Sequence, residues 1–430
     1  MPKPIWLLCL FAAMLAAQPA PEWLRGADMV TNWARGSSTV DQARLAGIPL
    51  LINVTQKEWI EDAHRKGFRG IIYASCMDTF VDVTSLENGQ ASDMDGNYHR
   101  QMTTGRMPFN RESSGALLVD ADGRFVDTLM DGTYRLHRKM ICVNSASYQQ
   151  VMLAYLRTLM DRGMDGIFVD NTGPRTIQCG GDGMRIGYSN YYRTVLAESP
   201  RSRFKDPRLG EVPVHRHLYP DKDQSYALRQ MLVKVRAMVK EYSPDKVMLI
   251  NGGPEFADAA DGTMIESYVC SWAWKGRRQT WPELKKSAAR YAPYVAAGGT
   301  VVARSYLGET QSTVKDDAYF CFAAARLSGF VWSDYQTLKD DPSTALYRVH
   351  LGAPAAPLAA AADGVDYRWF QKGLVVMNGT DAPAAVVIPA PAGTRLGAVS
   401  DVYDAREFAL ADGTLRLTVP AQSGRVYQAR

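Results

Sequence analysis

The stretch CVNSASYQQVMLAYLRTLMDRGMDGIFVDN (residues 142–171) decides the fold class. Its first part carries apolar residues at helical spacing and stops at Gly163, which is typical of a helix that ends on a glycine. The run DGIFVDN (165–171) then passes from apolar residues directly into a carboxylate and an amide. A helix followed by a near-continuous apolar strand indicates a parallel sheet that is covered on both faces.

The same unit recurs along the chain. Eight short apolar runs alternate with amphipathic stretches, and they lie at 27–33, 48–55, 68–75, 165–171, 246–252, 262–267, 299–306 and 329–335. This alternation predicts an α/β fold, a (β/α)8 TIM barrel over residues 27–350. Two enlarged loops, 76–144 and 172–222, follow the third and fourth strands.

A change of composition follows the barrel. The Ala- and Pro-rich segment APAAPLAAAADG (353–364) is interpreted as a linker. The short alternating runs that come after it predict a small antiparallel β-sandwich over residues 365–430.

The first 20 residues, MPKPIWLLCLFAAMLAAQPA, have the form of a secretory signal peptide. The sequence therefore predicts a secreted or periplasmic protein whose mature form does not span a membrane. Disulfides can form in such a compartment. The favoured pair is Cys76–Cys142, a pair of Cys179 with Cys270 is a weaker alternative, and Cys321 is expected to be a buried thiol.

Charge and composition exclude several classes of function. The formal net charge is only +4, so no strong electrostatic footprint for nucleic acid is visible. None of the six histidines falls at the end of a predicted strand, and no His/Cys spacing typical of zinc occurs. We therefore expect neither a metal nor a cofactor.

Carboxylates follow three of the predicted barrel strands: Asp170, Glu266 and Asp334. Residues at the carboxyl ends of barrel strands converge on one site, and two facing carboxylates can cleave a glycosidic bond. The sequence predicts Asp170 as nucleophile and Glu266 as general acid/base, roughly 5–6 Å apart, which favours a retaining mechanism. A purely structural role stays open, with Asp170 capping a helix or pairing with Arg175, and Glu266 pairing with Arg304.

Further polar and aromatic side chains at these strand ends are expected to bind the sugar: Trp33, Tyr73, Asp78, Asn171, Asn251, Arg304 and Asp334. The segment SYVCSWAWKGRRQTW (267–281) adds Trp272 and Trp274 as stacking surfaces for pyranose rings, together with Tyr268 and Trp281. Trp332 is a further candidate. The alternative for any one of these aromatic residues is packing under a loop.

Residues 142–171 also carry a family resemblance. Their C-x-N-S turn, helix and DGIFxDN strand resemble those of uncharacterised glycoside-hydrolase-like TIM barrels, which are similar to retaining α-galactosidase-like and α-amylase-like enzymes. The resemblance implies an Asp nucleophile after the fourth strand, which Asp170 matches, and in some relatives an acid at the sixth strand, as Glu266 is here. Phe168 stands where the amylase pattern has arginine. The implied partner is an oligo- or polysaccharide substrate.

Two other functions remain open from the sequence. A non-catalytic carbohydrate-binding barrel would use the aromatic segment without needing both carboxylates. A polysaccharide lyase would use Tyr306 as base, with Arg304 neutralising a uronate. Whether Asp170 and Glu266 face each other in one open pocket distinguishes a hydrolase from the binding barrel.

Overall fold

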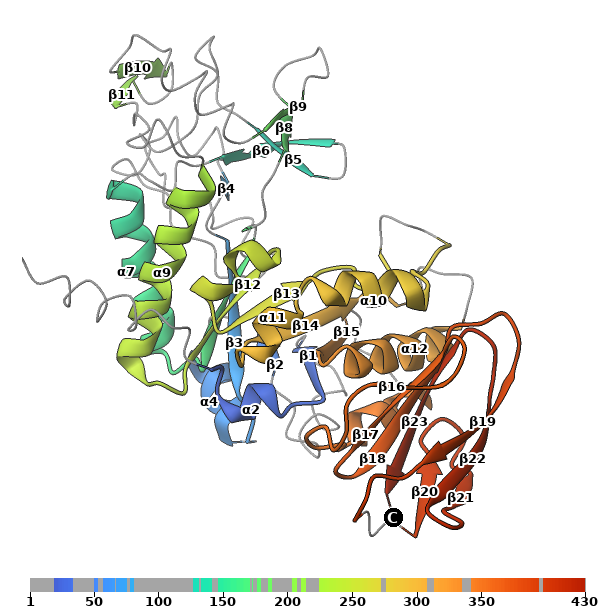
Figure 1. Cartoon of the computed structure of the whole chain (residues 1–430). Coiled ribbons are helices and arrows are strands. Elements are labelled where there is room, and N and C mark those ends of the chain that lie inside the picture. Colours follow the sequence, from blue (N-terminus) through green and yellow to red (C-terminus); the bar gives the residue numbers. More distant parts are fainter. Residues whose placement is uncertain are drawn as a thin grey trace, which may run out of the picture.

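The structure is a computed structural model in which a barrel is followed by a β-rich C-terminal module (Figure 1). It describes residues 19–33, 50–52, 57–65, 67–75, 78–80, 127–130, 133–140, 146–170, 172, 176–178, 185–187, 203–206, 210–213, 224–271, 276–307, 313–334, 342–393 and 397–429.

Eight parallel strands form a closed barrel, because β1 pairs with both β2 and β15. The strands are β1 (Met29–Trp33), β2 (Leu50–Ile52), β3 (Gly70–Ser75), β7 (Gly166–Asp170), β12 (Val247–Asn251), β13 (Gly262–Ile265), β14 (Thr300–Ser305) and β15 (Val331–Asp334). Each predicted apolar run supplies one of them. The predicted (β/α)8 barrel is confirmed.

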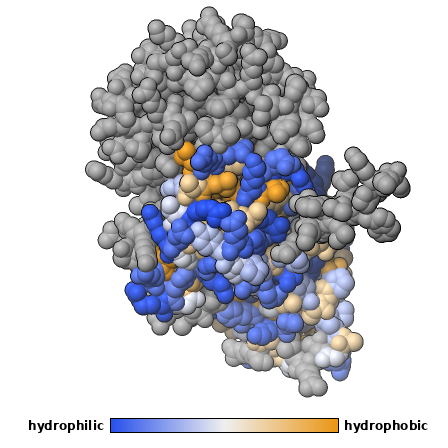
Figure 2. Space-filling model, turned by 90° about the vertical axis from the view of Figure 1, so that its left-hand side faces the viewer, coloured by the Kyte–Doolittle hydropathy of each residue, from blue (hydrophilic) through white to orange (hydrophobic). Residues whose placement is uncertain are grey.

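Helices lie between most consecutive barrel strands: α4 (Lys57–Arg65), α7 (Ala146–Asp161), α9 (Gln224–Tyr242), η4 (Pro254–Ala259), α10 (Trp281–Ala289), α11 (Ala292–Ala296) and α12 (Val314–Leu327), with η5 (Pro342–Arg348) after β15. Figure 2 shows the side on which α7 and α9 lie. Hydrophilic residues predominate there, because these helices turn their apolar residues toward the barrel.

The enlarged loops contain short antiparallel strands. β4 (Asp78–Phe80), β5 (Asp127–Met130) and β6 (Thr133–Met140) form one small sheet. β8 (Thr176–Gln178) pairs with β9 (Arg185–Gly187), and β10 (Arg203–Asp206) pairs with β11 (Gly210–Pro213).

A short helix, α2 (Glu22–Arg25), precedes β1. Ala20 and Leu24 are fully buried in the same apolar cluster as Val30, Leu249 and other barrel residues. The backbone N–H of Ala20 donates to the carbonyl of Gly298 just before β14 (3.2 Å). Residues upstream of the predicted barrel boundary at 27 therefore complete the barrel core, and Ala20, the last residue of the predicted signal peptide 1–20, is one of them.

The C-terminal module is an antiparallel sandwich, as predicted. One sheet holds β16 (Ala359–Ala362), β17 (Val365–Phe370), β18 (Gly373–Asn378), β23 (Ser423–Ala429), β20 (Ala398–Asp401) and β21 (Glu407–Ala409); the other pairs β19 (Ala384–Pro389) with β22 (Thr414–Val419). Strand β16 lies inside the segment interpreted as a linker. Its alanines have little strand preference, so pairing with β17 determines their conformation.

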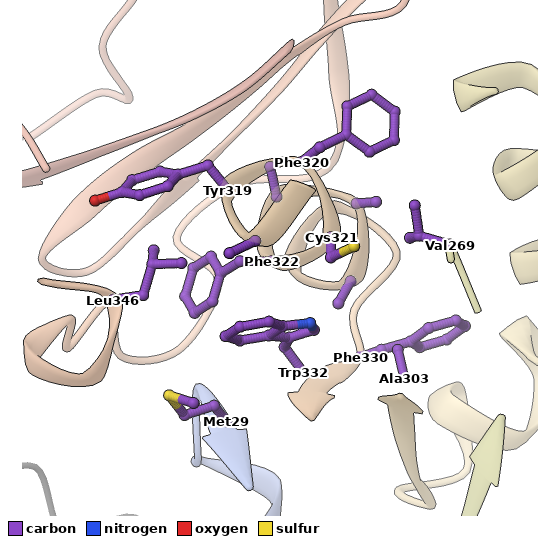
Figure 3. Packing of buried hydrophobic residues seen from close by; sticks show 14 of the residues in the cluster. Met29, Val269, Ala303, Tyr319, Phe320, Cys321, Phe322, Phe330, Trp332 and Leu346 are labelled. Carbon is purple, nitrogen blue, oxygen red and sulfur yellow. The ribbon is translucent and has the colours of Figure 1, made fainter. Parts of the chain in front are cut away.

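Helix α12 lies between the barrel and the C-terminal module, and this position explains why it is apolar nearly all round. One side packs on Trp332 of β15, with the ring of Phe322 in edge contact at 5.8 Å (Figure 3). The other side meets β18 and β23. A Cβ atom on Gly424 would lie 2.5 Å from the Cβ of Ala323, so glycine is required for this close approach.

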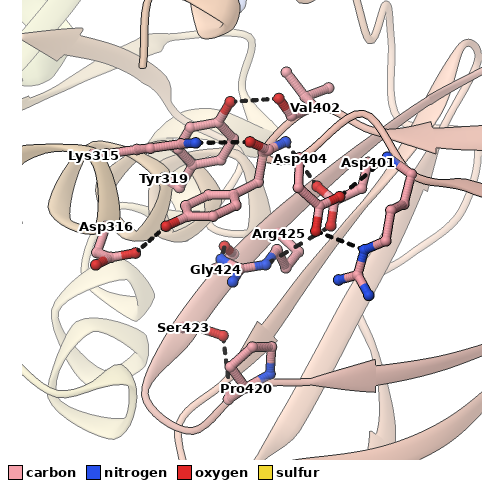
Figure 4. A network of polar contacts seen from close by, with 12 residues as sticks. Lys315, Asp316, Tyr319, Asp401, Val402, Asp404, Pro420, Ser423, Gly424 and Arg425 are labelled. Atoms are coloured by element: carbon pink, nitrogen blue, oxygen red, sulfur yellow. Dashed lines mark hydrogen bonds and ion pairs between the residues drawn. The ribbon is translucent and has the colours of Figure 1, made fainter. Parts of the chain in front are cut away.

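Polar contacts reinforce the same interface (Figure 4). The Tyr319 hydroxyl donates to the carbonyl of Val402 (2.8 Å), and the Tyr403 hydroxyl donates to Asp316 Oδ1 (2.9 Å). Asp401 accepts a hydrogen bond from the Tyr403 N–H (2.8 Å) and lies 3.8 Å from Arg425 Nε.

Cys321 is fully buried, as expected, and so is Cys270; neither forms a disulfide in the structure. Cys76, Cys142 and Cys179 lie outside the described residues. Within the described part of the chain, no helix combines the length and the apolar character needed to cross a bilayer.

The packing of α2 generates a stability prediction. Leu24→Ala should lower the free energy of unfolding by about 3 kcal/mol, because it leaves a cavity among barrel residues. Arg25→Ala, on the exposed face of the same helix, should change it by less than about 0.5 kcal/mol. Urea unfolding followed by circular dichroism measures both. Equal effects of the two substitutions would contradict the packing of Leu24 in the barrel core.

Asp401 generates a pH prediction. Burial raises the pKa of Asp401 to about 6, so the folded protein binds this proton more tightly than the unfolded chain does. The contribution of Asp401 to the free energy of unfolding should therefore fall as the pH rises from about 4 to 6, and stay level above that. Asp401→Asn should remove this part of the dependence. Parallel stability profiles for the two proteins in urea titrations from pH 4 to 7 would contradict the prediction.

Candidate active site

The apolar filling of the barrel determines which side chains reach its carboxyl-terminal end. Buried residues from seven strands form one cluster inside it: Val30, Ile71, Phe168, Val247, Leu249, Met264, Val302 and Val331. Alternate residues of a strand point to the same face. Residues two positions beyond these cluster members therefore form the next layer: Tyr73, Asp170, Asn251, Glu266 and Arg304.

Asn251 links the two predicted catalytic carboxylates. Its Nδ2 donates to Asp170 Oδ1 at 2.6 Å and to Glu266 Oε2 at 2.9 Å. The two oxygens therefore lie at most about 5.5 Å apart, the sum of these distances. Asp170, Asn251 and Glu266 belong to, or directly follow, the neighbouring strands β7, β12 and β13.

A tyrosine hydroxyl holds the second oxygen of each carboxylate. Tyr73 of β3 donates to Asp170 Oδ2, and Tyr306, directly after β14, donates to Glu266 Oε1. Each carboxylate thus accepts one phenol and one amide hydrogen bond. This arrangement orients both groups and compensates for their proximity.

The two carboxylates differ in exposure. Asp170 is half-buried, and the ring of its partner Tyr73 lies beside that of Phe168, with the ring centres 5.9 Å apart. Glu266 is exposed. The half-buried Asp170 and the exposed Glu266 are therefore suited to different steps of one reaction.

The backbone around Asn251 is fixed from both sides. Thr172 Oγ1 donates to the carbonyl of Asn251, and Thr263 Oγ1 donates to the carbonyl of Gly252, both at 2.7 Å. A Cβ atom on Gly252 would lie 2.7 Å from Thr172 Oγ1, so a larger residue would displace this support. Thr172 therefore positions Asn251 from the segment that follows Asp170.

The chain turns sharply after Glu266. Ser267 has φ +63°, a left-handed conformation that is uncommon for a residue with a side chain and costs on the order of 1 kcal/mol. The next residue, Tyr268, donates its N–H to the carbonyl of Arg304 (2.7 Å). This turn places Glu266 beside the end of β14, where Tyr306 contacts it.

Arg304 is half-buried in the same layer, with Nη1 3.8 Å from Met264 Sδ. Among the described residues, Glu266 contacts Asn251 and Tyr306 instead of forming the ion pair with Arg304 that was considered from the sequence.

Asp334 does not lie with the other predicted site residues at the carboxyl-terminal end of the barrel interior. In β15, Val331 faces the barrel interior, so Trp332 and Asp334 face outward. Asp334 is fully buried and accepts a hydrogen bond from the Tyr347 hydroxyl, whereas Trp332 packs under α12. Neither side chain has an open surface for a sugar.

Of the aromatic candidates in segment 267–281, the structure describes Tyr268 and Trp281. Tyr268 is buried, with its hydroxyl 2.7 Å from Ser328 Oγ. Trp281 is buried too, and its Nε1 donates to Asp366 Oδ2 of the C-terminal module at 2.5 Å. Tyr268 and Trp281 are therefore packing residues, which was the alternative to binding a sugar.

Five candidates cannot be placed as side chains. Asn171, Trp272 and Trp274 lie outside the described residues, as does Arg175. Trp33 and Asp78 contribute backbone to β1 and β4, and the structure does not describe their side chains. Within the described ranges, no cluster of three or more His, Cys, Asp or Glu residues could hold a metal ion.

Comparisons with known proteins bear on the fold. No family model and no curated protein matches the chain. The solved structures similar to it include Amy13B of Eubacterium rectale (10% identity, TM-score 0.54, covering 97% of this chain and 98% of that one). An Anoxybacillus alpha-amylase is similar at 8% identity and TM-score 0.51, covering 95% and 98%.

A GH27 β-L-arabinopyranosidase from Geobacillus stearothermophilus is similar at 10% identity and TM-score 0.50, covering 95% of this chain and 97% of that one. The fold is therefore a distant glycoside-hydrolase-like barrel with a C-terminal sandwich.

The position of Asn251 generates a prediction. Asn251→Asp replaces the shared donor with a third carboxylate and should lower the free energy of unfolding at pH 7.5 by about 2 kcal/mol more than Asn251→Ala does. The difference should shrink at pH 5, where carboxylates begin to bind protons. Urea unfolding of both variants measures it. Equal stabilities at pH 7.5 would show that Asn251 does not lie between two charged groups.

Proposed function

We propose that this protein is a glycoside hydrolase that cleaves an O-glycosidic bond with Asp170 and Glu266 by a retaining mechanism. One observation carries the proposal: the two carboxylates share the amide nitrogen of Asn251 at the carboxyl-terminal end of a closed barrel. Active sites of TIM-barrel enzymes lie at this end.

The spacing favours retention of configuration. Retaining glycosidases hold their carboxyl groups about 5–5.5 Å apart, whereas inverting enzymes leave about 6.5–9.5 Å for a water molecule. The upper limit of about 5.5 Å between the bonded oxygens of Asp170 and Glu266 fits the first class.

Asp170 is assigned as nucleophile. Hydrogen bonds from Tyr73 and Asn251 fix its orientation. Its carboxylate attacks the anomeric carbon while the bond to the leaving oxygen breaks, which gives a covalent glycosyl ester on Asp170.

Glu266 is assigned as general acid/base. Its exposure gives it access to the leaving group and to water. It protonates the departing oxygen in the first step. In the second step it removes a proton from water, which attacks the anomeric carbon and releases Asp170. Tyr306 acts as a positioning residue through Glu266 Oε1.

The substrate class is an oligo- or polysaccharide. Arg304 lies in the same layer as the carboxylates and is assigned to bind sugar hydroxyls. Trp33, Trp272 and Trp274 are proposed as stacking surfaces, with Asp78 and Asn171 as polar contacts. The N-terminal segment 1–20 supports export as a secreted or periplasmic enzyme, and the mechanism needs no cofactor.

The alternatives fit the contacts less well. A binding-only barrel has no need to hold two carboxylates on one amide. A lyase would need Tyr306 as base, but its hydroxyl donates to Glu266 and is therefore held as a phenol.

Two substitutions test the role of each carboxylate on an aryl glycoside that the protein hydrolyses. Asp170→Asn should lower kcat/KM at least about 10³-fold for every leaving group, because it removes the nucleophile. Glu266→Gln should cause a similar loss with poor leaving groups and a much smaller loss with dinitrophenolate, which departs without protonation. Asp363→Asn, in an exposed turn of the C-terminal module, is the control and should leave the rate unchanged.

The configuration of the first-formed sugar, observed by proton NMR, tests the retaining step directly. Retained configuration is expected. Inverted product would overturn the covalent mechanism, and near-normal turnover by Asp170→Asn would overturn the assignment of the site.

A further inference from the structure

Two buried thiols face each other beside the candidate active site. Cys270 lies four residues after Glu266, and Cys321 lies in the middle of α12. Their Sγ atoms are 3.7 Å apart, and both side chains are fully buried. Figure 3 shows Cys321 on the side of α12 that faces the segment holding Val269.

We propose that Cys270 and Cys321 form a disulfide bond when the protein folds in an oxidising compartment. The bond length of a disulfide is about 2.05 Å, so the sulfurs must approach by roughly 1.7 Å. Neither thiol is accessible to solvent. The inference is independent of the proposed hydrolase activity.

The reaction is thiol–disulfide exchange during folding. The thiolate of one cysteine attacks a disulfide donor such as oxidised glutathione, forms a mixed disulfide and releases one thiol. The second cysteine thiolate then displaces the other half of the donor. The two cysteine thiols lose two electrons and two protons in total, and the donor is reduced to two thiols.

Burial determines when this exchange takes place. Burial and the neighbouring Cys270 raise the pKa of the Cys321 thiol well above its usual range, so the packed thiol is a poor nucleophile. The bond must therefore form before α12 packs against the 268–271 segment. Once formed, it is shielded from reductants.

The bond would fix the segment that carries Glu266. The carbonyl of Cys270 accepts a hydrogen bond from the N–H of Tyr306 (3.2 Å), and the Tyr306 hydroxyl contacts Glu266. A covalent link from Cys270 to α12 therefore holds both ends of this contact against the same helix.

A peptide map tests the proposal. The full-length protein is refolded in a buffer of oxidised and reduced glutathione, its free thiols are alkylated, and it is digested with trypsin without reduction. Residues 247–275 and 316–326 are tryptic peptides with one cysteine each. We expect them to be recovered joined, with a mass two hydrogens below their sum. Recovery as separate alkylated peptides, or Cys270 joined to Cys179, would overturn the proposal.

Stability gives a second readout that does not depend on catalysis. The bond closes a loop between residues 51 positions apart, which restricts the unfolded chain. In the oxidised protein, Cys270→Ala and Cys321→Ala should each lower the urea midpoint by about 1 M, and the double variant should be no worse than either one. Additive losses in the oxidised protein would overturn the proposal.

Discussion

The shared amide of Asn251 is the interaction on which the candidate site depends. Two carboxylates so close together repel each other unless donors lie between and around them, and Asn251, Tyr73 and Tyr306 are those donors. The closed barrel brings β3, β7, β12, β13 and β14 into consecutive contact, so every member of the group comes from adjoining strands. The geometry of the site is therefore a consequence of strand order and alternation.

The opposite end of the barrel uses acidic residues differently. Asp28, Asp165 and Asp261 each precede a barrel strand, and each accepts a backbone N–H at 2.8–2.9 Å. Each also lies near a cation, with Arg326, Lys246 and Arg236 respectively at 2.8–3.1 Å. These carboxylates have structural partners at buried positions. At the candidate site, Tyr73, Asn251 and Tyr306 donate hydrogen bonds to the two carboxylates, and Glu266 is exposed.

The barrel, its strands and the sandwich could be predicted because apolar runs and turns are local signals. Asp170, Asn251 and Glu266 could be placed at one end because each follows a long apolar run. The run VWSD of β15 misled the prediction because both faces of this strand are buried, so the sequence does not show that Trp332 and Asp334 point outward. Burial of Trp281 depends on Asp366, 85 residues away, and no local pattern reveals it. The contact of Tyr306 with Glu266 was missed, although Val302, Arg304 and Tyr306 follow the same alternation.

Mass spectrometry of the covalent intermediate shows directly which carboxylate is the nucleophile. A 2-fluoro sugar with a good leaving group, matched to the hydrolysed glycoside, slows the second step and accumulates the ester. We expect the added mass on tryptic peptide 163–175, at Asp170. Label on Glu266 in peptide 247–275, or turnover without any covalent adduct, would contradict it.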